Sequence, residues 1–164
     1  MQEILSSREI QQKIERIAHQ LIENTFNEDH IFVGGIHGNG SVLANSLAEI
    51  IRSNSETNVT SFEININKDK PWDDTIEISA KPEELTNSYI VLVDDVINSG
   101  KTLQFALVEM LKFPTKAIKT VTLVDRKHRR FPIKANFVGL SLSTTLQDRV
   151  EVDLTAGAEK AYLI

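Results

Sequence analysis

The sequence predicts an α/β fold in which a mainly parallel central sheet is flanked by helices. Residues 89–93 form an unbroken apolar run rich in β-branched side chains, which is typical of a strand buried on both faces of a parallel sheet. Residues 117–124 have the same character. Apolar residues at helical spacing follow the first run over 103–111, and they also follow a glycine-rich turn over 42–51. This alternation of buried strands with helices favours a parallel sheet.

Length and composition predict one domain, 1–164, of ordinary globular character. The chain has 41% apolar and 25% charged residues and no cysteine. A disulfide framework, a thiolate metal site and a thiol nucleophile are therefore excluded. No stretch resembles a signal peptide or reaches the length of a membrane span, so a cytoplasmic location is expected. The net charge of −5 disfavours non-specific binding of nucleic acid by the whole surface.

The first predicted element is a helix over 6–26. Ser6 and Glu9 have the spacing of a capping box, and an apolar stripe follows them. The opposite face carries Arg16 and His19, for which a solvated polar face is the simpler interpretation.

The second predicted unit is a strand that ends in the glycine-rich turn His37-Gly38-Asn39-Gly40. A turn of this kind before a helix can hold a phosphate, because the helix N-terminus offers unpaired N–H groups and positive charge. The turn begins like a dinucleotide fingerprint, but the third glycine position holds Leu43 and no acidic strand end follows at the ribose-binding distance. A purely structural turn remains an alternative.

Residues 58–66 alternate as a strand. The charged segment 68–74 then predicts a hairpin tip or mobile loop before 75–79, and 81–88 form a polar connection. Trp72 in this segment suggests either a lid or partner contact, or structural packing.

The chain is organised around the end of the 89–97 strand. Asp94 and Asp95 are acceptors at the carboxyl end of the strand, where open α/β sheets bind ligands and where carboxylates can anchor ribose hydroxyls or Mg²⁺. The turn Asn98-Ser99-Gly100-Lys101-Thr102 adds hydroxyl donors and a close backbone approach before a helix. A Walker A loop would need glycine at the position of Asp95, and a single helix-capping Asp would explain neither the pair nor the turn. The pattern favours a phosphorylated sugar as the ligand.

The 117–124 strand ends in the basic run 126–133, on the same side of the predicted sheet as the other two turns. Residues 136–141 and 149–154 predict two short final strands.

Residues 90–102 resemble the phosphoribosyl diphosphate (PRPP) signature of the type I phosphoribosyltransferases. That signature has four apolar, two acidic, two apolar and one variable residue before Ser/Thr-Gly-Lys/Arg-Thr, and every class of residue is present here. Residues 17–23 and 124–139 extend the resemblance to one branch of the family, the bifunctional pyrimidine-operon regulators and uracil phosphoribosyltransferases (PyrR).

The resemblance implies a type I phosphoribosyltransferase fold with a short hairpin lid, usually assembled as a homodimer. It also implies Mg²⁺-dependent transfer of ribose 5-phosphate from PRPP to a nucleobase, uracil for this branch, with release of pyrophosphate. The partners would then be PRPP and a nucleobase or nucleoside monophosphate.

The resemblance also assigns roles to residues of this chain. Asp94 and Asp95 would bind the ribose and Mg²⁺, and Asn98, Ser99, Gly100, Lys101 and Thr102 would cradle the 5′-phosphate. His37, Gly38, Asn39 and Gly40 would form the pyrophosphate loop, and Lys68 and Asp69 would belong to the lid. The base would be framed by Arg126, His128, Arg129, Pro132 and Ile133.

Three positions depart from the family. Its pyrophosphate loop has Lys-Thr-Arg where this chain has His37-Gly38-Asn39, and charged hydrogen bonds contribute about 1.5–3 kcal/mol each. The lid has Lys68 instead of Arg, which keeps the charge without the bidentate fork. Asn98 replaces the usual Tyr, and it cannot serve as a carboxylate base, unlike the Asp of purine-using relatives.

Regulatory RNA binding with little catalysis is the alternative function. Basic side chains that could contact RNA are Arg16, His19, Lys127 and Arg130, with His128 and Arg129 also matching basic positions of the branch. However, the loop 143–148 lacks the lysines of the branch, and Asn24 stands where Arg is usual. Fewer positively charged side chains are therefore present to contact RNA phosphates.

Overall fold

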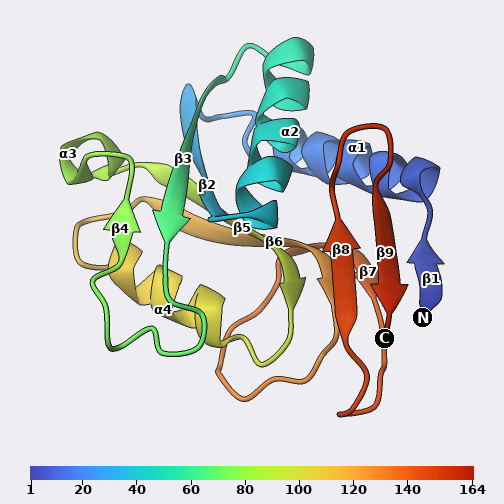
Figure 1. The fold of residues 1–164 in the computed structure, drawn as a ribbon. Coiled ribbons are helices and arrows are strands. Elements are labelled where there is room, and N and C mark those ends of the chain that lie inside the picture. The colour runs from blue at the N-terminus through green and yellow to red at the C-terminus, as the bar shows by residue number, and fades with distance from the viewer.

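A six-stranded sheet forms the centre of the protein in the computed structural model, which describes residues 1–164 (Figure 1). Its strand order is β4-β3-β2-β5-β6-β7, and all neighbouring pairs are parallel except β3 with β4. The strands are β2 (His30–Ile36), β3 (Asn58–Asn65), β4 (Glu77–Ile78), β5 (Tyr89–Ile97), β6 (Ala117–Asp125) and β7 (Phe137–Ser141). The predicted α/β fold with a mainly parallel sheet is confirmed.

Helices cover both faces of this sheet. The helices are α1 (Ser7–Asn24), α2 (Asn39–Asn54), the single turn α3 (Pro82–Leu85) and α4 (Lys101–Met110). Figure 1 shows α1 and α2 on one face of the sheet and α4 on the other. Because successive side chains of a strand point to opposite faces of the sheet, the hydrophobic core is divided into two clusters, one on each face. Val33 and Val91 pack with α1 and α2, whereas Phe32 and Ile90 pack with α4.

The predicted first helix is confirmed, with its ends moved inward by a residue or two. The Ser6 hydroxyl accepts a hydrogen bond from the Glu9 N–H, and the Glu9 carboxylate accepts one from the Ser6 N–H at 2.8 Å. This reciprocal capping box satisfies two backbone donors that would otherwise lack partners at the helix start.

A second, antiparallel sheet lies beside the first one and was not predicted. It has the order β1-β9-β8, from β1 (Gln2–Leu5), β8 (Val150–Asp153) and β9 (Lys160–Leu163), so the two ends of the chain pair with each other (Figure 1). The buried Glu159 links this sheet to α1, because its carboxylate accepts hydrogen bonds from the Ser7 hydroxyl at 2.5 Å and the Gln11 amide at 2.6 Å. The four-residue strands β1 and β9 carry too little periodicity to be recognised in the sequence.

Two smaller features add detail to the sequence prediction. After the segment 68–74, the chain pairs with β3 only at Glu77–Ile78, and the polar connection 81–88 contains α3. None of the helices combines the length and the apolar character needed to cross a bilayer.

Candidate active site

Three strand ends bring the predicted site residues to one edge of the central sheet. Because β2, β5 and β6 are parallel neighbours, their carboxyl ends place His37, the acidic pair and the segment 126–133 on the same side. A pocket of about 210 Å³ lies at the end of β5. It is lined by Lys68, Asp94, Val96, Ile97, Asn98, Ser99, Gly100, Lys101, Thr102 and Leu103.

The turn that leads from β5 into α4, residues 98–102 (the phosphate turn), has the geometry of a phosphate cradle. Gly100 adopts a φ of +86°, in the left-handed region, and α4 begins directly after it. The N-terminus of α4 therefore directs backbone N–H groups into the pocket. The Ser99 carbonyl accepts hydrogen bonds from the N–H groups of Arg130 and Phe131 at 2.9 and 3.0 Å. The segment 126–133 (the basic segment) therefore fixes the position of the turn through its backbone.

The acidic pair combines one buried carboxylate with one that is partly exposed. Asp94 is 4% exposed. Burial, and then the charge of Asp95, raise the pKa of Asp94 to about 8, while Lys68 acts in the opposite direction. The Lys68 ammonium lies 3.7 Å from the Asp94 carboxylate. A cation bound beside Asp94 would therefore favour the ionised carboxylate.

Mg²⁺ fits this donor set only together with oxygens from a ligand. No group of three or more His, Cys, Asp or Glu side chains is placed to hold a metal ion. Mg²⁺ is commonly bound by one or two carboxylates with water and substrate phosphates completing the octahedron. Asp94, which lines the pocket, and the adjacent Asp95 match that arrangement.

The predicted pyrophosphate loop is linked to the acidic pair through Asn39. The Asn39 amide donates to the Asp95 carboxylate at 3.1 Å and to the Val152 carbonyl of β8 at 2.8 Å. Gly40 is required for this close approach, because a Cβ there would lie 2.9 Å from the Val93 carbonyl. The small sheet therefore contributes directly to the position of this loop.

His37 has a partner that the sequence analysis missed. Its Nδ1 lies 2.6 Å from the Glu63 carboxylate of β3, and the Ser41 hydroxyl donates to the other Glu63 oxygen at 3.0 Å. The hydrogen bonds from His37 and Ser41 lower the pKa of Glu63. Glu63 and His37 are far apart in sequence and only become neighbours because β2 and β3 pair, so no local signal indicated the contact.

The predicted lid lies against the phosphate turn and α4. The Lys101 ammonium donates to the Asp69 carbonyl at 2.9 Å and lies 5.8 Å from the centre of the Trp72 ring. The Trp72 ring in turn lies 6.2 Å from that of Phe105 on α4. Trp72 is still 62% exposed, so it packs on one side only and the alternatives of packing and lid contact both apply to it.

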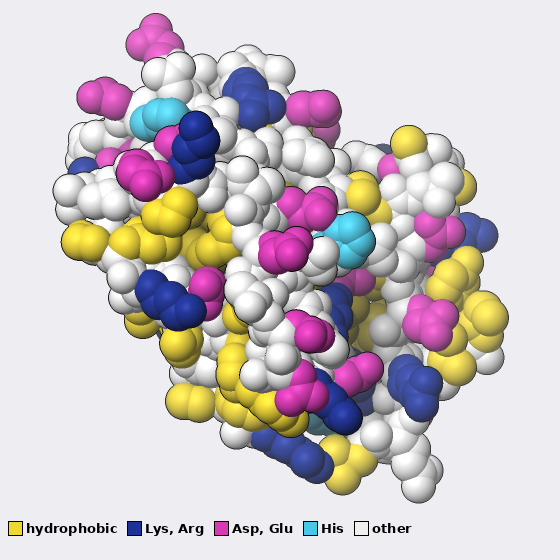
Figure 2. Space-filling view, turned by 60° about the vertical axis from the view of Figure 1, so that its left-hand side comes forward, with side chains coloured by type: hydrophobic (Ala, Val, Ile, Leu, Met, Phe, Trp, Pro, Cys, Tyr) yellow, Lys and Arg dark blue, Asp and Glu magenta, His cyan; other side chains and the backbone are white.

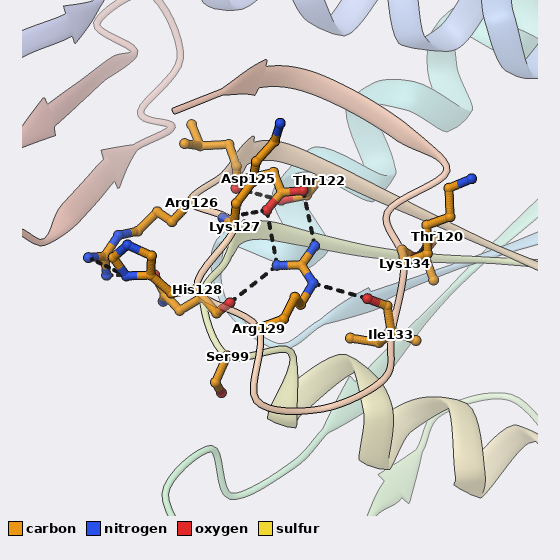
Figure 3. A network of polar contacts seen from close by, with 12 residues as sticks. Ser99, Thr120, Thr122, Asp125, Arg126, Lys127, His128, Arg129, Ile133 and Lys134 are labelled. Carbon is orange, nitrogen blue, oxygen red and sulfur yellow. Dashed lines mark hydrogen bonds and ion pairs between the residues drawn. The ribbon is translucent and has the colours of Figure 1, made fainter. Parts of the chain in front are cut away.

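Arg129 ties the basic segment to β6 and to the phosphate turn (Figure 3). Its guanidinium makes two hydrogen bonds of 3.0 Å to the Asp125 carboxylate, and it also donates to the carbonyls of Ile133 at 3.0 Å and Asn98 at 3.2 Å. Asp125, which was not a predicted site residue, thus orients a residue that was predicted to frame the base. Pro132 is exposed on this segment, and Ile133 packs against Gly100.

We expect Arg129→Lys to destabilise the protein by about 2–4 kcal/mol. The ammonium cannot form the bidentate fork, so part of the bonding to the buried Asp125 carboxylate and to both carbonyls is lost. Urea unfolding measures the change, with Arg130→Lys as the exposed control. Equal stability of the two variants would show that the fork contributes little.

Arg126 is buried, with 8% of its surface exposed, and its hydrogen bonds join three segments. It reaches Asn98 in the phosphate turn, His128 in its own segment, and Thr144, Thr145 and Asp148 in the following loop. Its contact with His128 is visible in Figure 3. The predicted base-framing residues Arg126 and His128 therefore bond to one another and to carbonyls of the 143–148 loop.

The residues predicted to contact RNA do not form one continuous basic surface. The Arg16 guanidinium donates to the carbonyls of Val138 and Gly139 at 3.1 and 2.8 Å. His19 shares a hollow between α1 and α2 with Glu15 and Glu49. Lys127 and Arg130 are exposed on the basic segment. On the face shown in Figure 2, acidic and basic side chains intermingle.

Comparisons with known proteins agree with this architecture. Residues 1–154 match the family model of the phosphoribosyl transferase domain. The chain is 34% identical over 161 residues to the bifunctional protein PyrR of Herpetosiphon aurantiacus, covering 93% of this chain and 89% of the relative. It is 31% identical over 160 residues to PyrR of Bacillus mycoides, covering 92% and 89%.

Solved structures show the same fold at lower identity. A hypoxanthine-guanine phosphoribosyltransferase of Bacillus anthracis matches with a TM-score of 0.72 and 24% identity, over 87% of this chain and 82% of that one. The hypoxanthine phosphoribosyltransferase of Trypanosoma cruzi matches with a TM-score of 0.79 and 13% identity, over 99% and 95%. Family model, relatives and fold agree, and the chain belongs to the phosphoribosyltransferase family, in its PyrR branch.

Proposed function

We propose that this phosphoribosyltransferase uses PRPP and Mg²⁺, and that it transfers ribose 5-phosphate to a nucleobase, with uracil as the acceptor. One observation carries the proposal: the phosphate turn and Asp94 line the same pocket, and the adjacent Asp95 is linked to the predicted pyrophosphate loop through Asn39. One ribose phosphate can therefore meet backbone donors through its phosphate and carboxylates through its hydroxyls. The choice of uracil rests on the similarity to PyrR proteins.

The residues of the chain would act by position and charge. The N-terminus of α4, with Ser99 and Thr102, binds the 5′-phosphate, and Asp94 and Asp95 hold the ribose. Mg²⁺ held with Asp94 and Asp95 would neutralise charge on the departing pyrophosphate. The transition state of glycosyl transfer has oxocarbenium character, so carboxylates close to the ribose stabilise it electrostatically.

The pyrophosphate loop supports the proposal with less charge than the family pattern provides. His37 faces the Glu63 carboxylate, and Asn39 donates to Asp95. Lys68 and Lys101 are the cations that line the pocket. In the structure the lid places Lys68 beside Asp94, so we propose that PRPP and Mg²⁺ displace this ammonium when they bind.

The test is release of pyrophosphate from PRPP and Mg²⁺ in the presence of single nucleobases. Turnover with uracil is the expected result, because the phosphate turn and Asp94 line the pocket and Asp95 is the next residue along the strand. Turnover with hypoxanthine or guanine alone would overturn uracil as the acceptor. If no base leads to release of pyrophosphate while PRPP still raises the melting temperature, the result would favour a ligand sensor without catalysis.

A regulatory RNA-binding protein is the second candidate, because the relatives carry the name bifunctional protein PyrR. For this function we propose contacts through Arg16, His19, Lys127 and Arg130. Binding of an RNA hairpin that changes with PRPP or a nucleotide, and that weakens at high salt, would support it. We also propose a homodimer, which sedimentation equilibrium tests directly.

A further inference from the structure

Asn98 is an exposed residue that lines the pocket and is the first residue of the phosphate turn, three positions after Asp95. Its side-chain oxygen accepts a hydrogen bond from the Arg126 guanidinium, with 2.8 Å between Oδ1 and Nη1. Its backbone carbonyl accepts another from Arg129 at 3.2 Å. Both ends of the residue are therefore tied to the basic segment.

Arg126 determines which way the amide of Asn98 faces. A guanidinium carries only donors, so only the oxygen of the amide can face it, and a flipped amide would place donor against donor. Arg126 cannot turn away to relieve such a clash, because it is buried and also donates to the Thr144 hydroxyl at 3.1 Å and the Thr145 carbonyl at 3.2 Å.

His128 supports the same orientation. Its Nδ1 lies 3.3 Å from Arg126 Nη2 and accepts a hydrogen bond from it, while its Nε2 lies 2.8 Å from the Thr144 carbonyl and donates to it. Both contacts are satisfied by one neutral tautomer of the imidazole. The network thus holds Arg126 from its own segment and from the 143–148 loop.

The nitrogen of the Asn98 amide has no hydrogen-bond partner in the protein, although the oxygen is bound. The two N–H groups of this nitrogen are therefore free to meet a ligand in the pocket that Asn98 lines. The position presents donors only, which complements an acceptor atom and disfavours another N–H group.

The acceptor atom can be identified if the proposed function is correct, and this step rests on it. A ribose whose phosphate lies on residues 99–102 and whose hydroxyls face Asp94 would bring its anomeric carbon into the part of the pocket that Asn98 lines. The part of a base closest to this carbon is the nitrogen that becomes ribosylated and the group next to it. In uracil that group is the 2-oxo oxygen.

We propose that Asn98 determines base selectivity by donating a hydrogen bond to the carbonyl oxygen next to the ribosylated nitrogen, and that Arg126 is the positioning residue that orients its amide. In the reaction, the base nitrogen forms a bond to the anomeric carbon, the bond from that carbon to pyrophosphate breaks, and the nitrogen proton passes to water. Negative charge that develops on the base is shared with its 2-oxo oxygen, where the Asn98 donor stabilises it. An amide at this position supports transfer without acting as a base.

Substitutions of Asn98 test this inference from the protein side of the contact. With uracil, Asn98→Ala is expected to lower kcat/KM by about ten- to hundredfold. Asn98→Asp should lower it further, because an acceptor then faces an acceptor. Asn45→Asp, an exposed amide on α2, is the matched control and should leave turnover unchanged. A gain of activity in Asn98→Asp would mean that a carboxylate base is what the site lacks, and it would overturn the inference.

Sulfur analogues of the base identify the atom that Asn98 contacts. Sulfur is a weak acceptor, so the wild-type protein should use 2-thiouracil about tenfold less well than uracil, and 4-thiouracil nearly as well as uracil. The penalty for 2-thiouracil should vanish in Asn98→Ala and shrink in Arg126→Gln. An unchanged penalty in Asn98→Ala would show that it comes from another contact.

Binding of uridine 5′-monophosphate separates this inference from the proposed function. Calorimetry should show about tenfold weaker binding to Asn98→Ala than to the wild-type protein, whether or not turnover occurs. Equal binding by both proteins would overturn the role of Asn98 even if uracil is the substrate. If the wild-type protein shows no turnover but still binds uridine 5′-monophosphate more tightly than Asn98→Ala does, only the proposed catalytic function is overturned.

Discussion

Asp95→Asn is expected to abolish pyrophosphate release, with a loss of at least about a hundredfold in kcat. The change keeps the shape of the side chain and removes the charge that would hold ribose hydroxyls and Mg²⁺. In the structure the Asp95 carboxylate accepts hydrogen bonds from the Asn39 amide at 3.1 Å and from the Val96 N–H at 2.9 Å, and an Asn oxygen can retain one of them. The measurement is pyrophosphate release from PRPP with the preferred base.

Stability distinguishes this loss from unfolding. The charge of Asp95 is one of the causes that raise the pKa of Asp94, so removing it relieves a repulsion in the folded protein. Asp95→Asn should therefore melt no lower than the wild-type protein at neutral pH. Asp73→Asn, an exposed lid carboxylate, serves as the control and should retain activity. Full activity in Asp95→Asn would remove the acidic pair from the mechanism.

Gly100→Ala is expected to destabilise the protein by about 2–5 kcal/mol and to weaken PRPP binding. Gly100 has a φ of +86°, which costs an L-residue about 1–2 kcal/mol. A Cβ at this position would also lie 2.3 Å from the Ile133 side chain, so the phosphate turn and the basic segment must separate. Overpacking of this kind costs about 1–3 kcal/mol. Urea unfolding and calorimetry with PRPP measure the two effects.

Gly157→Ala isolates the backbone contribution. Gly157 has a similar φ of +81°, but nothing lies within 4 Å of the position that its Cβ would occupy. This variant should lose only the backbone cost of about 1–2 kcal/mol and keep its affinity for PRPP. If both variants lose the same stability, the contact between Gly100 and Ile133 has no energetic weight.

The phosphate turn and the acidic pair were predictable because their signals are local. Buried strand, carboxylates, glycine turn and helix follow one another within residues 89–111, and each pattern has its own periodicity or residue type. The ends of β5 and α4 lie close to where the sequence places them. The parallel order of the strands then brings 126–133 to the same edge, as predicted.

The partners of the site residues could not be predicted from the sequence. His37 meets Glu63, Asn39 meets Val152, and Arg126 meets Asn98, each across a large gap in the chain. The family resemblance implied a base-binding role for Arg126, His128 and Arg129, and the structure adds the protein partners that hold their polar atoms. The sequence separation of these pairs follows no regular spacing, so a pattern along the chain cannot reveal them.

The sequence by itself determined the fold class, the family resemblance and the position of the acidic pair and phosphate turn, because short-range patterns encode strands, turns and helix starts. Only the tertiary structure decided the orientation of the Asn98 amide, the contact of Lys68 with Asp94, and the pairing of the two chain ends in β1 and β9. These features depend on which side chains the folded chain brings within hydrogen-bond distance, and that distance is set by strand pairing and packing.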